Sequence, residues 1–147
     1  MPGIGEAAPE FDATIASGTT LRLSSLRGAP VVLYFYPQAD TPGCTIESKG
    51  FRDIYPELRA KGVHVVGVSV DPVEDQAAFA GKYQLPFPLV ADTSKEVARR
   101  FGTLGAGGKA RRVTFFISPT GTIEEIVDSS KADAHVGRAR ARYLAAP

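Results

Sequence analysis

The sequence predicts an α/β fold with a mixed central β-sheet, helices on both faces and an N-terminal β-hairpin. One observation is the continuous run of β-branched and aromatic residues at Val31–Tyr36, which is typical of a central strand covered on both faces. A second is the alternation of amphipathic helical patterns with further apolar runs through the middle of the chain. A third is a Pro-Thr-Gly turn signal between two later apolar runs, which predicts an antiparallel pair.

The residues before the central strand are expected to form a short strand, a turn and a second short strand. Ser17-Gly18 supplies the turn, and Leu21 and Leu23 alternate with Arg22. This alternation has the period of two that marks a strand with one buried face.

A long helix is predicted to follow the central strand. Thr41 stands at its N-cap, Pro42 at the first helical position and Cys44 at the third. Pro56 indicates a kink within the helix, and Gly62 ends it. The apolar residues recur at helical spacing and define one face: Phe51, Ile54, Tyr55 and Leu58.

A second buried strand is predicted at Val63–Val70, and a second helix after it. Asp71 is expected to cap this helix, with Pro72 at its first position and Glu74 at its third. The helix is expected to run to about Tyr83.

A short strand and a third helix come next. Leu89–Ala91 is a short apolar segment, and Thr93 and Glu96 have the spacing of a capping box. Gly102 is expected just past the end of the helix. The apolar residues of this helix are Val97, Ala98 and Phe101.

The last elements are predicted to be a hairpin and a helix. Val113–Ile117 and Thr122–Val127 are expected to pair across the turn Pro119-Thr120-Gly121. Asp133–Ala145 follows as an amphipathic helix. Its inward residues are expected to be Val136, Ala139, Tyr143 and Leu144.

This order of elements is that of the thioredoxin fold with an added N-terminal hairpin and an inserted helix. Because no internal repeat and no low-complexity linker interrupts the pattern, residues 1–147 are expected to form a single domain.

Composition excludes several classes of function. The formal net charge is +1, so neither a nucleic-acid partner nor a membrane partner is expected. No apolar run approaches the length of a membrane span and no leader is visible, which favours a cytoplasmic location. One cysteine cannot form an intramolecular disulfide, and the two histidines do not complete a zinc site with it. No metal and no cofactor is therefore expected, and an enzyme or a binding domain remains.

Cys44 is the candidate for chemistry. In the first turn of a helix, its sulfur faces free N–H groups and the positive end of the helix dipole, which stabilise a thiolate. A free cysteine is more often a buried small residue. The Thr-Pro-Gly before Cys44 and its place at a strand-to-helix switch, where α/β proteins bind ligands, favour the reactive interpretation.

Four segments carry a family resemblance. The stretch "FYPQADTPGCTIES", with Pro37, Thr41 and Cys44, resembles the active-site segment of peroxiredoxins, in particular the peroxiredoxin Q or bacterioferritin comigratory protein branch. "RRVTFFISPTG" is similar to a later segment of that family, with Arg112 before the strand and Ser118 in place of the usual Asp. The opening "GEAAPEF" and "LSSLRGAPVVLYFYP" also match.

The resemblance implies an antioxidant thiol peroxidase that reduces hydrogen peroxide and organic hydroperoxides. It implies that Cys44 is the nucleophile, that Arg112 stabilises the thiolate and the developing negative oxygen, and that Thr41 accepts a hydrogen bond from the peroxide. The amides of Gly43 and Cys44 would hold the peroxide oxygens, and Pro37 would shield the sulfur. These catalytic and substrate-binding roles are expectations for this chain.

Arg112 has a competing interpretation, because it stands beside Arg111 and Lys109 in what could be a solvated run of charge. Only the resemblance favours Arg112 over Arg111 for the site. Strand alternation adds a little, since it places Arg112 on one face with Thr114 and Phe116, and Arg111 on the other face with Val113 and Phe115. The surrounding "GTLGAGGKARR" is not a phosphate-binding loop, because no Ser or Thr follows the lysine. It is expected to be a flexible loop beside the active site.

The sequence departs from the family pattern at Lys49, where many relatives carry a resolving cysteine. A one-cysteine cycle is therefore expected, with thioredoxin, glutaredoxin or a low-molecular-weight thiol as the external reductant, in a monomeric protein. Glu47 is expected to be structural, and His64 and His135 to be local polar residues. The alternative function is a non-catalytic thioredoxin-fold module that binds other proteins.

Overall fold

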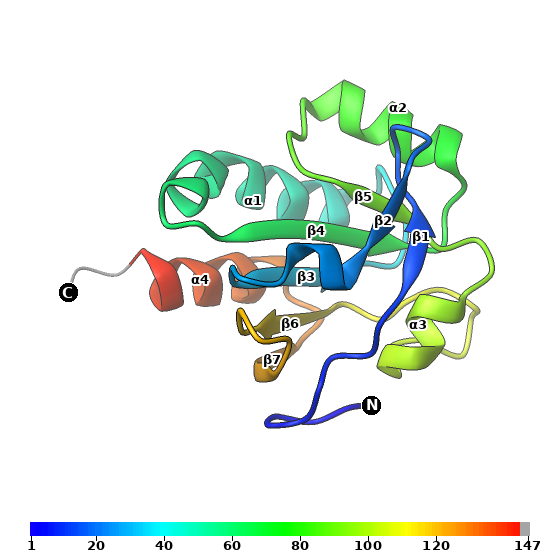
Figure 1. Cartoon of the computed structure of the whole chain (residues 1–147). Helices are drawn as coiled ribbons and strands as arrows, with labels where there is room; N and C mark the ends of the chain where they lie inside the picture. The colour runs from blue at the N-terminus through cyan, green and yellow to red at the C-terminus, as the bar shows by residue number, and fades with distance from the viewer. Residues whose placement is uncertain (145–147) are drawn as a thin grey trace.

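A five-stranded sheet lies at the centre of the computed structural model, which describes residues 1–144 (Figure 1). The strand order is β5-β4-β3-β6-β7. β3, β4 and β5 run parallel, β6 is antiparallel to β3, and β7 is antiparallel to β6. The predicted mixed sheet is thus confirmed. The strands are β3 (Val31–Phe35), β4 (His64–Ser69), β5 (Leu89–Ala91), β6 (Val113–Ile117) and β7 (Ile123–Asp128).

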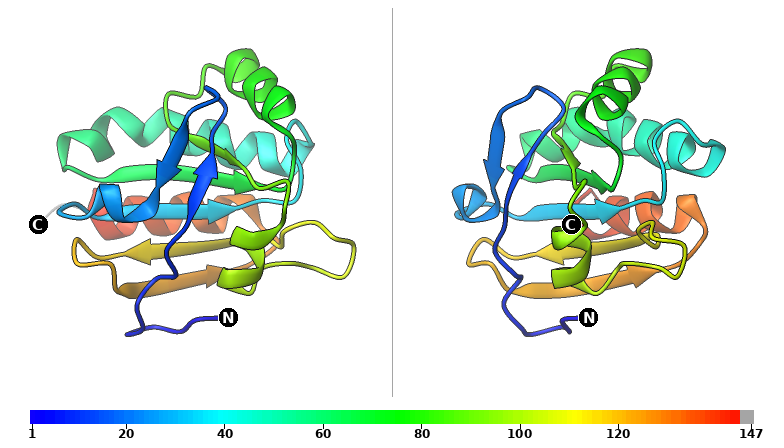
Figure 2. Two further views of the ribbon diagram at one scale, coloured as in Figure 1. Left: turned by 45° about the vertical axis from the view of Figure 1, so that its right-hand side comes forward. Right: turned by 90° about the vertical axis from the view of Figure 1, so that its right-hand side faces the viewer.

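Helices cover both faces of this sheet (Figure 2). α1 and α4 pack against each other on one face, with α2 beside β5. α3 and the N-terminal segment cover the other face. The helices are α1 (Pro42–Ala60), α2 (Val73–Tyr83), α3 (Glu96–Phe101) and α4 (Ala132–Tyr143). Of the predicted last helix, Ala145 lies outside the described residues.

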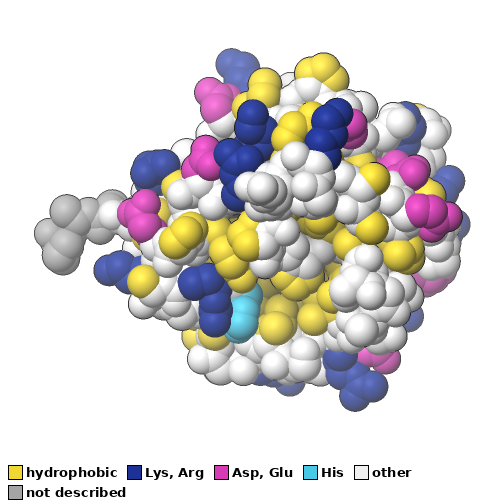
Figure 3. Space-filling view, turned by 90° about the horizontal axis from the view of Figure 1, so that it is seen from above, with side chains coloured by type: hydrophobic (Ala, Val, Ile, Leu, Met, Phe, Trp, Pro, Cys, Tyr) yellow, Lys and Arg dark blue, Asp and Glu magenta, His cyan; other side chains and the backbone are white. Residues whose placement is uncertain are grey.

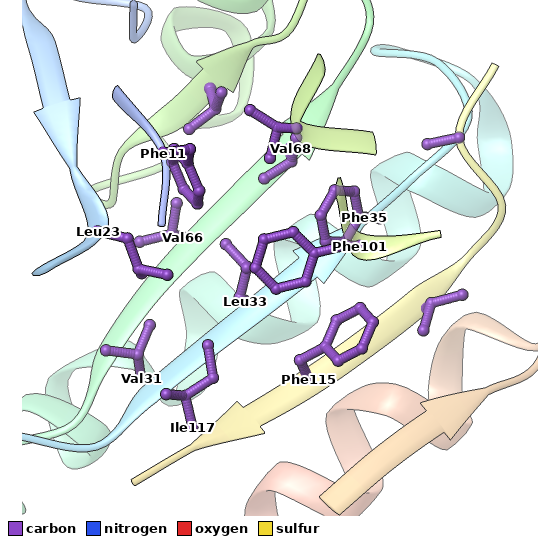
Figure 4. Close-up of a cluster of buried hydrophobic side chains, with 14 of the residues drawn as sticks. Phe11, Leu23, Val31, Leu33, Phe35, Val66, Val68, Phe101, Phe115 and Ile117 are labelled. Carbon is purple, nitrogen blue, oxygen red and sulfur yellow. The ribbon is translucent and has the colours of Figure 1, made fainter. Parts of the chain in front are cut away.

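Side chains of the central strand alternate between two apolar clusters, one on each face of the sheet. Leu33 and Phe35 of β3 point into the cluster under α3, where they meet Phe101 and Phe115 (Figure 4). Val32 and Tyr34 point into the cluster beneath α1 and α4, which also contains Cys44. The candidate nucleophile therefore lies on the α1 and α4 face.

The N-terminal hairpin forms a small sheet of its own. β1 (Asp12–Thr14) pairs antiparallel with β2 (Thr20–Arg22), as predicted. Leu23, expected in the second strand, instead begins a 3₁₀ turn, Leu23–Leu26, and is buried against the main sheet.

Two predicted helix caps are wrong because other partners satisfy the side chains. α2 begins at Val73 with Pro72 as its N-cap, so Asp71 does not cap it. The Asp71 carboxylate instead accepts hydrogen bonds from the Ala39 amide at 2.8 Å and the Ser69 hydroxyl at 2.6 Å. This ties the turn before α2 to the loop that follows β3.

The capping box before α3 is also absent. Lys95 occupies the N-cap with a left-handed backbone, φ 65°. The carboxylate of Asp92 accepts hydrogen bonds from the amides of Val97 at 3.1 Å and Ala98 at 2.8 Å, the role expected of Thr93. Gly102 ends the helix with φ 68°, as predicted.

Viewed from above, the side of the molecule that carries α1 and α2 shows apolar side chains gathered in a hollow, with charged side chains around it (Figure 3). Among the described residues, no helix is both long and apolar enough to cross a membrane.

Candidate active site

Cys44 lies in the first turn of α1, at the position the sequence predicts. Thr41 is the N-cap residue and Pro42 the first helical residue, which places Cys44 third. The Thr45 amide, next along the chain, donates to the Thr41 carbonyl at 2.8 Å. The amides of Gly43 and Cys44 precede this bond, so the helix does not use them as donors. The Cys44 side chain is fully buried.

The Thr41 hydroxyl does not cap the helix, contrary to the prediction. It donates to the Gln38 carbonyl at 2.8 Å, within the loop between β3 and α1. Because its hydrogen is committed there, the lone pairs of the oxygen remain the part of the hydroxyl that can engage a ligand.

Arg112 reaches Cys44 from the chain segment just before β6. Its Nη2 donates to Cys44 Sγ at 3.4 Å, and its Nη1 donates to Glu47 Oε1 at 2.6 Å. The pairing of Val113 with Phe35 brings this segment to the end of β3, where the loop to α1 begins. The predicted proximity of Arg112 and Cys44 is confirmed.

Arg111 does not compete for this place. It forms an ion pair with Asp128 at 3.0 Å, and both side chains are exposed. The two neighbouring arginines thus have different partners, in agreement with their expected places on opposite faces of the strand.

Gly43 has a second property that the sequence does not reveal. A Cβ atom at this position would lie 2.9 Å from Arg112 Nη2. The absence of a side chain at Gly43 therefore lets the guanidinium reach the sulfur.

Glu47 is a buried member of the site. It lies one turn after Cys44, its side chain is 0% exposed, and it is the ion-pair partner of Arg112. Burial raises the pKa of Glu47 to about 8, because the Arg112 guanidinium only partly offsets the loss of solvation. Sequence reasoning identified the carboxylate but not its contact with the cation.

His135 of α4 completes the buried group and was missed by the sequence analysis. Its side chain is 0% exposed, and its Nδ1 lies 3.6 Å from Glu47 Oε2. Thr114 Oγ1 is 2.7 Å from the same ring nitrogen. Burial lowers the pKa of His135, and the nearby Arg112 charge acts in the same direction. Only the packing of α4 against α1 places the ring here, and no local pattern in the sequence predicts it.

The loop that carries Pro37 is held by three neighbouring segments. Asp71 binds the Ala39 amide at 2.8 Å. Asp40 accepts hydrogen bonds from α2, from Lys82 at 2.9 Å and from the Tyr83 hydroxyl at 2.8 Å. In addition, Lys109 donates to the Gln38 side chain, which places the glycine-rich loop beside the site, as predicted.

A cavity of about 320 Å³ opens next to Pro37 and Arg112. Pro37 and Arg112, two of the residues named for the site, thus face the same space. The cavity is lined by Pro37, Arg111, Arg112, Asp128, Ser129 and Ser130. Within residues 1–144, no three His, Cys, Asp or Glu side chains group as metal ligands.

Lys49 lies on the exposed side of α1, with its Nζ 5.8 Å from the centre of the Tyr83 ring. Its position agrees with a solvated lysine. Cys44 is the one cysteine among the 147 residues of the sequence.

Comparison with known proteins gives a consistent result. The AhpC/TSA family matches residues 4–126. A putative peroxiredoxin bcp of Coxiella burnetii is 40% identical over 140 residues, covering 90% of this chain and 93% of that protein. Peroxiredoxin Bcp of Escherichia coli K12 is 38% identical over 138 residues, covering 89% and 88%. The crystal structure of peroxidoxin BcpB from Mycobacterium tuberculosis superimposes with a TM-score of 0.90 at 37% identity, covering 98% and 97%.

Proposed function

The chain belongs to the AhpC/TSA family, as a thiol peroxidase of the peroxiredoxin Q and Bcp kind, and we propose that Cys44 reduces hydrogen peroxide and organic hydroperoxides in a one-cysteine cycle. The observation that carries this proposal is the 3.4 Å contact between Arg112 Nη2 and Cys44 Sγ at the start of α1. Family membership favours this enzyme over a non-catalytic protein-binding module.

In the first half of the cycle, the Cys44 thiolate attacks one oxygen of the peroxide. An S–O bond forms and the O–O bond breaks, so the sulfur is oxidised by two electrons and the peroxide is reduced. Cys44 becomes a sulfenic acid, and the departing oxygen takes up a proton to leave as water or an alcohol.

Arg112 and the helix amides supply the electrostatic part of this step. The guanidinium already contacts the sulfur, so it stabilises the thiolate and donates to the oxygen that becomes negative as the O–O bond breaks. The free amides of Gly43 and Cys44 complete the set of donors. A single preorganised donor of this kind is worth about 2.7–4 kcal/mol in the barrier.

Thr41 and Pro37 position the peroxide. Because the Thr41 hydroxyl donates its hydrogen to the Gln38 carbonyl, its oxygen is oriented to accept a hydrogen bond from the peroxide O–H. Pro37 lines the neighbouring cavity and limits the access of water to the sulfur.

The second half of the cycle needs an external thiol, since the sequence contains no second cysteine. A thiolate of thioredoxin, glutaredoxin or a low-molecular-weight thiol attacks the sulfenic sulfur, water leaves, and a mixed disulfide forms. A second thiol then reduces this disulfide and restores Cys44. We place this cycle in a monomer in the cytoplasm.

Intact-mass analysis tests the proposal. After one equivalent of hydrogen peroxide, the protein should gain one oxygen at Cys44, trapped by a sulfenic-acid reagent. Cys44→Ser should neither gain the oxygen nor consume peroxide. If the wild type turns over peroxide no faster than Cys44→Ser under excess dithiol, the proposal is wrong.

The two neighbouring arginines provide a matched pair of variants. Arg112→Ala should lower kcat/KM for hydrogen peroxide by about 10²–10³-fold, because a charged donor at the reacting atoms is lost. Arg111→Ala removes an exposed ion pair with Asp128 and should change kcat/KM by less than about threefold. Equal effects of the two substitutions would contradict the assignment of Arg112.

A further inference from the structure

Two buried titratable side chains lie behind the Cys44–Arg112 contact and take no part in the mechanism proposed for the site. Glu47 comes from α1 and His135 from α4, and both side chains are 0% exposed. The Glu47 oxygen Oε1 binds Arg112 at 2.6 Å. The other oxygen, Oε2, is buried and has no hydrogen-bond partner among residues 1–144. A buried carboxylate oxygen without a partner is costly, so this atom requires an explanation.

The hydrogen bonds of His135 identify the atom that faces this oxygen. Its Nε2 lies 2.8 Å from the Ser129 carbonyl, and a carbonyl only accepts, so Nε2 carries the ring hydrogen. Nδ1 is therefore the acceptor and receives the Thr114 hydroxyl at 2.7 Å. The same nitrogen lies 3.6 Å from Glu47 Oε2. The lone pair of Nδ1 already accepts the Thr114 hydroxyl, so a protonated Oε2 would be a second donor to the same nitrogen, whereas an ionised Oε2 faces it as an acceptor without a partner.

We propose that Glu47 and His135 hold one proton between them, and that this proton sets the charge that Arg112 presents to Cys44. With the proton in place, the three side chains Arg112, Glu47 and His135 together carry a net positive charge beside the sulfur. Without it, the ionised Glu47 cancels the charge of Arg112. His135 is thus a positioning residue, which acts on the sulfur through Glu47 and Arg112. This inference rests on the proposed function of Cys44.

The other groups around the pair agree with this assignment. Cys44 shares α1 with Glu47, Arg112 precedes β6, Tyr34 faces Glu47 from β3, and Asp128 faces His135 from β7. Among these four, Arg112 is the cation, and it already binds the other oxygen of Glu47.

The direction of each pKa supports the same picture. Burial raises the pKa of Glu47 to about 8 and lowers the pKa of His135, because a low-dielectric interior disfavours the charged form of both. The proton therefore resides on Glu47, and the pair releases it near pH 8. Above that pH, the cation at the sulfur is offset, and the negative oxygen of the transition state is less stabilised.

The test measures kcat/KM for hydrogen peroxide from about pH 5 to 10, since pH profiles report the essential groups of the free enzyme. The wild type should lose activity on the alkaline side, near pH 8. Glu47→Gln keeps an oxygen for Arg112 but has no proton to lose, so its alkaline limb should disappear. His135→Asn removes the ring acceptor and should move the limb to lower pH by about one unit.

His64→Gln is the matched control. His64 starts β4 and its ring contacts Arg59, so this variant should reproduce the wild-type profile. It also assigns the ring signals in NMR spectra, because the chain has two histidines. In the wild type, the His135 ring should keep its Nε2 hydrogen throughout, and its Nδ1 shift should move with one inflection near pH 8.

Three results would overturn the proposal: an alkaline limb that persists in Glu47→Gln, a His135 ring that does not respond near pH 8, or a His135→Asn variant that loses the same factor at every pH. The NMR titration of the His135 ring needs no turnover, so it still tests the shared proton if the chain proves to have no peroxidase activity. It also uses the wild type, so it decides the matter if His135→Asn does not fold.

Discussion

Gly43 shows at the residue scale how close the reactive groups are. A Cβ atom there would lie 2.9 Å from Arg112 Nη2, and the guanidinium would have to withdraw from the sulfur. Gly43→Ala should therefore lower kcat/KM for peroxide by about 10²-fold, since one preorganised donor is displaced. Steady-state kinetics with thermal unfolding as a check on folding would measure this effect.

The control for this substitution is Gly81→Ala. Gly81 lies in α2, and a Cβ atom there meets nothing within 4 Å. This variant should keep wild-type kinetics and gain up to about 1 kcal/mol in the free energy of unfolding. An equally active Gly43→Ala would show that Arg112 has room that the structure does not indicate.

Glu47 should also link stability to pH. Its pKa is raised from 4.5 to about 8 in the folded state, so the folded protein keeps a proton that the unfolded chain has released. The contribution to the free energy of unfolding is fully present below about pH 4.5 and is lost as pH rises to about 8. The slope is at most about 1.4 kcal/mol per pH unit.

Urea denaturation of the wild type and Glu47→Gln at several pH values between these limits would measure this term. The wild type should lose stability relative to Glu47→Gln as pH rises, because glutamine has no proton to release. Parallel curves for the two proteins would mean that Glu47 is ionised in the folded state throughout this range.

Single residues also mark how far sequence reasoning reaches. Strand alternation places Arg112 and Arg111 on opposite faces because it depends only on neighbours in the chain, and the family resemblance identifies Arg112 as the residue of the site. His135 could not be found, since its role depends on a neighbouring helix bringing Glu47 to 3.6 Å. The sequence therefore predicts the contact of Arg112 with Cys44, which follows from strand pairing, and misses the contact of His135 with Glu47, which follows from helix packing.

At the scale of elements, the packing of α1 on α4 is unusually close at Gly50. A Cβ atom there would lie 2.8 Å from Val136 Cγ2. Gly50→Ala should destabilise the protein by about 1–3 kcal/mol through overpacking, although alanine is the better helix former. Val136→Ala in the same protein should restore most of this loss, and a double-mutant cycle in urea would measure the coupling.

Gly137→Ala on α4 is the control for this pair. A Cβ atom at Gly137 has no neighbour within 4 Å, so this variant should gain stability from helix propensity alone. If Gly50→Ala behaves like Gly137→Ala, the two helices can separate more readily than the structure indicates.

Elements were predicted better than their first residues. The strong strands and the long helices follow from apolar period, which tertiary structure reinforces. The predicted caps of α2 and α3 were wrong because a local pattern does not show which other groups compete. For Asp71 the competing partner is distant in the chain, and for Thr93 a neighbouring residue takes the capping role. Asp71 binds the Ala39 amide instead of capping, and Asp92, in place of Thr93, accepts hydrogen bonds from amides in the first turn of α3.

At the scale of the whole molecule, the order of strands brings the site together. Arg112 and Cys44 are 68 residues apart and meet because β6 pairs with β3. The thioredoxin-like order of elements predicts this pairing, so the arrangement of the candidate site was within reach of the sequence. The depth at which Cys44 and Glu47 are buried could not be predicted from the sequence, because it depends on how α1 and α4 pack together.

Lys49→Cys tests whether the molecule can open around Cys44. The two positions are five residues apart in α1, which is about 7.5 Å along a helix axis, farther than the two Cα atoms of a disulfide. A disulfide between them therefore requires the start of α1 to unwind. This would break the hydrogen bonds of Glu47 to Arg112 at 2.6 Å and of Ser48 to Tyr34 at 2.8 Å, which join α1 to the central sheet and to the segment before β6.

After one equivalent of peroxide, we expect Lys49→Cys to form this disulfide, detected by intact mass. Amide hydrogen exchange should rise in the first two turns of α1, because the unwound segment loses its helical bonds. Lys61→Cys, at the other end of the same helix, is the control and should keep the sulfenic acid with α1 protected. A Lys49→Cys disulfide without any increase in exchange would contradict the helical geometry, whereas a persistent sulfenic acid would show that the folded molecule holds Cys44 closed throughout its cycle.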